Sequence, residues 1–219
     1  MNKIINFQKY PIENIENKKR ASLVKACRSA LKNTGMFSLP DFILKDVLEE
    51  TLSICLPLWA HEAFEHKRSH NIYFTSGMDD LDPGHPVLRK FFTSNHTICG
   101  DQVQNSKLSE LYNSSVITRF LADVMEKDAL FPMADPLAGL NIMAYKHGES
   151  LNWHFDRSEF TTTLLLQAPE IGGDFQYFHN LRSDDNPNYG KIAEFLDAAD
   201  DMTKTLSLKP GTLTVFKGI

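Results

Sequence analysis

The sequence lacks any long apolar stretch. Its apolar runs, such as residues 164–166, fall far short of the roughly 20 residues that a membrane-spanning helix needs. Residues 1–6 carry a lysine, but no run of apolar residues of the kind that forms the core of a secretory signal follows it. We therefore expect no membrane partner, no secretion and a cytoplasmic location.

Cysteine and positive charge are also scarce. Cys27, Cys55 and Cys99 are odd in number and widely spaced, which indicates reduced thiols rather than a disulfide framework. The chain has 23 basic and 28 acidic residues, a net charge of −5, so nothing favours a nucleic-acid partner. Its 15 phenylalanines are not interleaved with basic clusters and therefore predict a packed core. The sequence leaves the oligomeric state open.

The composition is that of an ordinary globular protein. With 219 residues, 42% of them hydrophobic, the chain has room for a single domain, 1–219, with a sizeable core. In residues 1–136, apolar residues recur at helical spacing in 17–33, from about Leu44 onward, and in 107–126. The segment 75–101 is rich in Gly, Pro, Asp and His, and we expect it to be irregular.

After residue 136 the apolar pattern changes to short runs separated by Gly and Pro turns. These runs predict strands at 140–145, 160–167, 175–178, 206–208 and 212–216. A polar insert, 180–203, contains one short helical patch. The order of elements predicts an α+β fold, in which a double-stranded β-helix (jelly-roll) core at 137–219 is packed against the N-terminal helices of 1–136.

One histidine motif fails on geometry. The sequence HEAFEH at 61–66 superficially resembles a zinc-protease helix, which needs two histidines four residues apart on one helix face. Here His61 and His66 are five apart, about 140° around a helix. His66 and His70 have the right spacing, but no catalytic glutamate or third ligand accompanies them. We expect an exposed helical surface at this segment.

A second motif, His154-Phe155-Asp156, suits a metal. On an extended backbone the side-chain period is two, so His154 and Asp156 lie on one side of the chain. They supply two corners of the 2-His-1-carboxylate triad that binds Fe(II) and leaves positions open for a cosubstrate and dioxygen. A similar triplet at His147 and Glu149 lies in a predicted turn between strands, where we expect solvated side chains.

The wider pattern supports the second motif. In order along the chain, the sequence carries YKHG at 145–148, WHFD at 153–156, LLLQ at 164–167, GGDF at 172–175 and PGTLTVFKG at 210–218. With these blocks, residues 141–219 resemble the catalytic core of the Fe(II)/2-oxoglutarate-dependent oxygenases. The resemblance implies a double-stranded β-helix fold, Fe(II) and 2-oxoglutarate as cofactors, and His154 and Asp156 as metal ligands and catalytic residues.

The resemblance also implies a reaction. Members of this family couple oxidative decarboxylation of 2-oxoglutarate by dioxygen to oxidation of a substrate. Radical halogenases on this scaffold have a small residue in place of the carboxylate ligand, so Asp156 favours hydroxylation. The size of the chain favours a small-molecule substrate such as a free amino acid or a related metabolite. The alternative is a non-catalytic jelly-roll binding protein with a degenerate metal site.

Three further residues are candidates. Asn141 and Tyr145 alternate with apolar neighbours on the strand before the motif, so either can face the cosubstrate or solvent. Arg157 directly follows Asp156 and can meet an anionic substrate or cap a surface loop. The family pattern also has a distal histidine and, about ten residues later, a basic residue that pairs with the far carboxylate of 2-oxoglutarate. We expect both in a continuation of the chain beyond Ile219.

Overall fold

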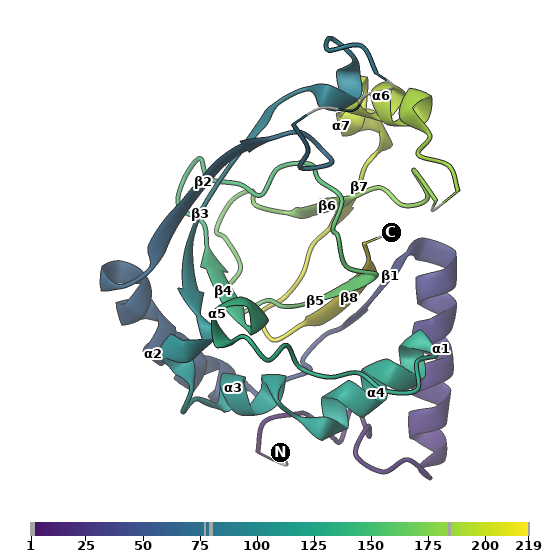
Figure 1. Cartoon of the computed structure of the whole chain (residues 1–219). Helices are drawn as coiled ribbons and strands as arrows, with labels where there is room; N and C mark the ends of the chain where they lie inside the picture. The colour runs from purple at the N-terminus through teal and green to yellow at the C-terminus, as the bar shows by residue number, and fades with distance from the viewer. Residues whose placement is uncertain (1–2, 77, 79–80, 184, 219) are drawn as a thin grey trace.

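Helices and antiparallel strands make up the computed structural model, which describes residues 3–76, 78, 81–183 and 185–218 (Figure 1). The expected α+β class is confirmed. Figure 1 shows helices α1 to α4 gathered around the N-terminal end and α6 and α7 at the opposite end of the molecule. The helices are α1 (Lys18–Thr34), α2 (Lys45–His61), α3 (Lys107–Tyr112), α4 (Ser115–Met125), α5 (Pro136–Gly139), α6 (Tyr189–Asp197) and α7 (Ala199–Met202). Among the described residues, none of these helices combines the length and apolarity needed to cross a membrane.

The first helix follows its local sequence closely. The Asn17 side chain accepts a hydrogen bond from the backbone N–H of Lys19 at 2.9 Å and so caps the N-terminus of α1. Gly35 ends the helix at φ +76°, a left-handed conformation that a residue without Cβ adopts easily. Val24, Cys27 and Leu31 lie on its buried face. The helix predicted at 17–33 is therefore confirmed.

The helix expected at 107–126 is divided into α3 and α4. The break falls at Asn113 and Ser114. The Ser114 side chain accepts a hydrogen bond from the N–H of Val116 at 3.2 Å, so it caps a new helix instead of continuing the old one. The apolar spacing runs across the break, which is why the sequence pattern does not reveal it.

The strands form three antiparallel sheets. The first has the order β1 (Met36–Leu39), β8 (Leu213–Lys217), β5 (Phe160–Leu164). The second has the order β2 (Phe64–His70), β3 (Phe91–Cys99), β4 (Asn141–Ala144). The third pairs β6 (Phe175–Tyr177) with β7 (Lys204–Leu206). Two short 3₁₀ helices, η1 (Pro86–Leu88) and η2 (Gly100–Val103), flank β3.

Two predictions about the middle of the chain are wrong. The segment 61–66 is not an exposed helical surface, because α2 ends at His61 and β2 begins at Phe64; His70 is 2% exposed. The segment 75–101 is not wholly irregular, because it contains all of β3. These two strands stabilise each other along seven residue pairs, from Phe64↔Thr97 to His70↔Phe91. This pairing is long-range, and the local pattern does not encode it.

The expected division into a helical part and a strand part at residue 136 needs the same correction. Strands β1, β2 and β3 precede residue 136, and they pair with strands that follow it: β1 with β8, and β3 with β4. The core also joins the two parts, since Phe42, Phe120 and Val215 belong to one buried cluster. The sheets therefore draw on the whole chain.

A second buried cluster positions the H-x-D segment. It gathers Ile72 and Val87 with buried residues of α6 such as Phe195, and Trp153 and Phe155 pack against it. The Trp153 ring meets the Phe195 ring edge-on with centroids 5.1 Å apart. Because Trp153 and Phe155 are held on this side, the alternate residues His154 and Asp156 are directed away from it.

Candidate functional site

His154 and Asp156 lie in the connection between β4 and β5. The segment has no strand partner of its own, but the N–H of Phe155 donates a 2.8 Å hydrogen bond to the carbonyl of Ile72, which fixes the backbone between them. The structure brings the two side chains together, as the sequence predicts: His154 Nε2 is 3.1 Å from Asp156 Oδ1. Each side chain is 21% exposed, so both are reachable from solvent.

The remaining polar atoms of the pair are fixed by neighbours. The Nδ1–H of His154 donates to the carbonyl of Asn152 at 2.7 Å, which leaves the lone pair of Nε2 facing Asp156 when the ring is neutral. The hydroxyl of Thr161, on β5, donates to Asp156 Oδ2 at 2.5 Å. One carboxylate oxygen is thus held by Thr161, and the other faces the imidazole.

The two side chains shift each other's pKa in opposite directions. Burial lowers the pKa of His154, but hydrogen bonds to Asp156 and to the Asn152 carbonyl outweigh it, and the net shift is upward. Burial raises the pKa of Asp156, but hydrogen bonds from His154 and Thr161 outweigh it, and the net shift is downward. Without an ion between them, the pair therefore favours imidazolium and carboxylate.

A hydrogen-bonded chain connects the pair to the sheet formed by β2 and β3. The Oγ1 of Thr93 on β3 accepts the N–H of Asn152 at 3.1 Å and donates to His70 Nε2 on β2 at 2.8 Å. His70 Nδ1–H donates to the carbonyl of Asn71 at 2.9 Å. We call the chain from His70 through Thr93 and Asn152 to His154 the His154 network. It ties the orientation of the imidazole to the sheet.

An aromatic ring packs against the same histidines. Phe74 stacks on His70 with ring centroids 4.4 Å apart and meets His154 edge-on at 5.5 Å. Its φ of +56° is rare for a bulky side chain. Buried Asn71 stabilises the turn, because its Oδ1 accepts the N–H groups of Tyr73 and Thr75 and its Nδ2 donates to the Thr75 carbonyl. The strained conformation places the ring beside the candidate site.

Acidification is expected to weaken the fold through His70. Burial lowers the pKa of His70 from its ordinary value of 6.5, so the unfolded chain takes up a proton at a higher pH than the folded protein. The stabilisation is complete above pH 6.5 and is lost as the pH falls below it, with a slope of at most about 1.4 kcal/mol per pH unit for one proton. Urea unfolding at pH 5.0–7.5 should show the stability difference between wild type and His70→Gln narrowing towards low pH. A constant difference would contradict this prediction, and exposed His147→Gln serves as control.

The other residues predicted for the site have no direct contact with the pair in the described structure. Asn141 is exposed at the start of β4, where its Nδ2 donates to the carbonyl of Ala138 at 3.0 Å. Tyr145 is 45% exposed, and its hydroxyl lies 3.5 Å from the sulfur of Met143. Arg157 is exposed. Their expected roles towards cosubstrate and substrate remain predictions.

Sequence reasoning missed a second polar cluster. Possible ligand atoms of Glu65, His96 and Glu149 all lie within 4.8 Å of one another. His147 does lie in a turn, but Glu149 beyond it is only 12% exposed and 3.2 Å from His96 Nδ1. The sequence signal that could have revealed the cluster is the H-x-E triplet of His147 and Glu149. Its partner His96 could not be assigned to the cluster, because β3 was not predicted.

Two lysine ammonium groups already contact the side chains of this second cluster. Lys67 Nζ lies 2.6 Å from Glu65, and Lys146 Nζ lies 3.0 Å from His96 Nε2. Glu149 also accepts the backbone N–H of Lys146 at 2.7 Å. Because the two cations compete directly with a metal ion for the same lone pairs, the cluster is better suited to joining β2, β3 and the turn after β4.

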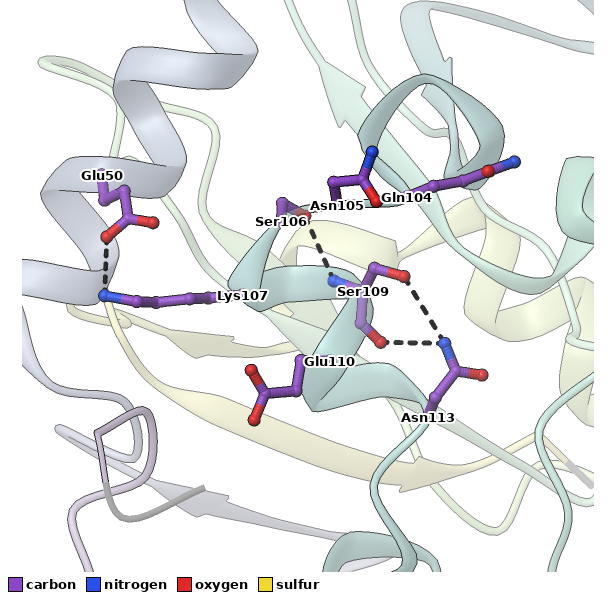
Figure 2. A pocket seen from close by; sticks show the side chains of 8 residues that line it. All are labelled: Glu50, Gln104, Asn105, Ser106, Lys107, Ser109, Glu110 and Asn113. Atoms are coloured by element: carbon purple, nitrogen blue, oxygen red, sulfur yellow. Dashed lines mark hydrogen bonds and ion pairs between the residues drawn. The ribbon is translucent and has the colours of Figure 1, made fainter.

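A surface pocket, shown in Figure 2, is far less suited to catalysis than the His154–Asp156 pair. It has a volume of about 320 Å³ and is lined by Glu50 on α2 and by residues 104–107, 109, 110 and 113. Figure 2 shows that the lining residues bond to one another: Lys107 Nζ lies 2.6 Å from Glu50, and Asn113 Nδ2 donates to the backbone carbonyl of Ser109 at 2.9 Å. None of the residues that line it belongs to the His154 network. It does not serve the H-x-D pair.

Comparison with protein-family models and with curated proteins finds no match for this chain.

Proposed function

We propose that the protein is an Fe(II)- and 2-oxoglutarate-dependent oxygenase that hydroxylates a small molecule, with His154 and Asp156 as metal ligands. The observation that carries the proposal is their spacing. Two ligands at right angles, each about 2.1 Å from a divalent ion, lie about 3 Å apart. His154 Nε2 and Asp156 Oδ1 are separated by 3.1 Å. The pair therefore fits one edge of an octahedral site.

The surroundings of the pair also fit a metal site. Metal-ligating histidines usually donate their second ring N–H to a carbonyl or carboxylate, and His154 does so to Asn152. Thr161 holds the far oxygen of Asp156, which leaves one oxygen for an ion. With one oxygen coordinated, the remaining positions stay open for 2-oxoglutarate and dioxygen. When bound, the iron and 2-oxoglutarate supply the oxidising chemistry, with succinate and carbon dioxide as by-products.

We further propose that the antiparallel sheets belong to a double-stranded β-helix and that the third ligand follows β8. An ideal Cβ on Gly218 would lie 2.7 Å from Asp156 Cβ and 2.1 Å from the Ser158 carbonyl. The backbone after β8 therefore runs directly past the carboxylate ligand. A histidine delivered from this side, as in the family that the sequence resembles, would complete the triad.

The alternative is a non-catalytic binding protein. Its supporting observation is that His154 Nε2 and Asp156 Oδ1 lie within hydrogen-bond distance, so the two side chains satisfy each other as an ion pair when the imidazole is protonated. In that case the pair stabilises the loop and needs no metal. The two functions differ in what the protein releases from 2-oxoglutarate.

Aerobic release of succinate tests the proposal. The full-length protein, including any residues after Ile219, is incubated with Fe(II), ascorbate and 2-oxoglutarate, and succinate is measured against an Asp156→Ala variant. We expect Fe(II)-dependent succinate from the wild type and at most background from the variant. Once a substrate is found, excess chloride should still give the hydroxylated product, because Asp156 occupies the halide position. Equal succinate from both proteins would refute the assignment.

A further inference from the structure

One face of the β2–β3 pair points towards the candidate site. Cross-strand partners share a face, and Arg68 on β2 lies directly opposite Thr93 on β3. Thr93 is the residue whose hydroxyl bonds the N–H of Asn152, two positions before His154. Two residues further along the same face, His66 lies opposite Asn95. Arg68, His66 and Asn95 therefore continue the surface on which the His154 segment is anchored.

The guanidinium of Arg68 is held next to the candidate metal ligand. Its central carbon lies 4.8 Å from the centre of the Phe74 ring, and the same ring lies 5.5 Å from the His154 ring. A guanidinium stacked on an aromatic face keeps its in-plane N–H groups free to bind an oxyanion. The strained turn at Phe74 therefore orients Arg68 as well as His154.

Arg68 has no carboxylate partner among the described residues. Other arginines of the chain do: Arg20 pairs with Asp123, Arg28 with Glu126, and Arg89 with Asp197. The amide of Asn95 adds a second donor group, Nδ2, because its Oδ1 accepts the Thr97 hydroxyl at 2.8 Å and so leaves the NH₂ end of the amide turned away from Thr97. Asn95 is 2% exposed, so this amide group is fixed in position.

We propose that Arg68 and Asn95 bind a carboxylate group of the small molecule that sits beside His154. The inference rests on the proposed function for the identity of that molecule. A guanidinium with an adjacent amide matches the planar geometry of a carboxylate. Two sources share this chemistry: the substrate itself and the far end of 2-oxoglutarate.

A metal-free probe isolates the site. Glutarate carries two carboxylates but no 2-oxo group with which to chelate iron, so calorimetric titration in EDTA reports on the carboxylate site alone. We expect Arg68→Met to weaken glutarate binding at least about tenfold, the effect of losing a charge-assisted hydrogen bond. Arg119→Met, which removes an exposed arginine from α4, should bind as the wild type does. If all three proteins bind glutarate equally, or the wild type does not bind it, the proposal is overturned.

A second titration identifies the source of the carboxylate. With Mn(II) present, 2-oxoglutarate is compared with 2-oxovalerate, which lacks the far carboxylate. If Arg68 holds the cosubstrate, the wild type's preference for 2-oxoglutarate disappears in Arg68→Met. If that preference persists while glutarate binding is lost, the carboxylate belongs to the substrate. Failure of Mn(II) to strengthen 2-oxoglutarate binding in the wild type counts against the oxygenase assignment and leaves the glutarate result standing.

Discussion

Replacing His154 with alanine is expected to weaken Mn(II) binding by at least about 100-fold and to abolish 2-oxoglutarate turnover. Loss of an outer-shell partner alone typically costs 10–100-fold in metal affinity, and His154 is proposed to contact the ion directly. His147→Ala should bind Mn(II) within about twofold of the wild type, because His147 lies in the exposed turn after β4. Titration of Mn(II) into the three proteins, followed by electron paramagnetic resonance of the free ion, measures the difference.

The same titration distinguishes metal binding at the His154–Asp156 pair from metal binding at the second cluster. His96 is the only histidine in the group with Glu65 and Glu149, so His96→Ala reports on that group alone. We expect it to lower stability, since it removes the hydrogen bond to Glu149, without changing Mn(II) affinity. Loss of Mn(II) binding in His96→Ala but not in His154→Ala would place the metal centre at the second cluster and contradict the proposal.

Local signals account for the elements that the sequence predicts well. The helix at 17–33 has its own cap and end residue in Asn17 and Gly35, and the short strands after residue 136 are separated by Gly and Pro. The pairing of β2 with β3 has no such local signal. β2 is almost wholly polar. The central strand β3 has buried residues on both faces, Thr93 and Asn95 on one and Ser94 and Ile98 on the other, so neither strand alternates. The hydrogen bonding between β2 and β3, and not a pattern within either segment, therefore defines them as strands.

The candidate site likewise combines residues that local sequence predicts with residues that only long-range contacts position. The spacing of His154 and Asp156 is local, so the sequence predicts their proximity. The alternation that packs Trp153 and Phe155 against the second buried cluster directs both polar side chains to one side. Their supporting residues come from other parts of the chain. Thr161 follows from β5, while Thr93 and His70 depend on the unpredicted pairing of β2 and β3. Long-range contacts therefore position a locally encoded pair.

That dependence makes Thr93 the most informative residue outside the pair. Its hydroxyl joins the sheet to the segment that carries His154, since it bonds both His70 Nε2 and the Asn152 N–H. Thr93→Val keeps the shape of the side chain but removes the hydroxyl. It leaves a buried imidazole nitrogen and the part-buried N–H of Asn152 without these partners, which is expected to cost about 1–3 kcal/mol of folding free energy.

The larger consequence is expected at the metal site. Without the Thr93 hydroxyl, the backbone N–H of Asn152 loses its bond to the sheet, and the Asn152 carbonyl that orients the His154 ring is held less firmly. Outer-shell changes of this kind weaken metal binding about 10–100-fold. We therefore expect Thr93→Val to weaken Mn(II) binding at least about tenfold, and Thr93→Ser, which restores the hydroxyl, to bind as the wild type does.

A matched threonine separates this effect from a loss of stability. Thr214 is fully buried on β8, and its hydroxyl bonds that of Ser38 at 3.0 Å. Thr214→Val should lower the free energy of unfolding by a similar amount, measured in urea, without changing Mn(II) affinity, because the Thr214 hydroxyl has no place in the His154 network. If Thr93→Val and Thr214→Val lose stability equally and both retain wild-type Mn(II) affinity, the His154 network is structural only, and the sheet does not position the metal ligand.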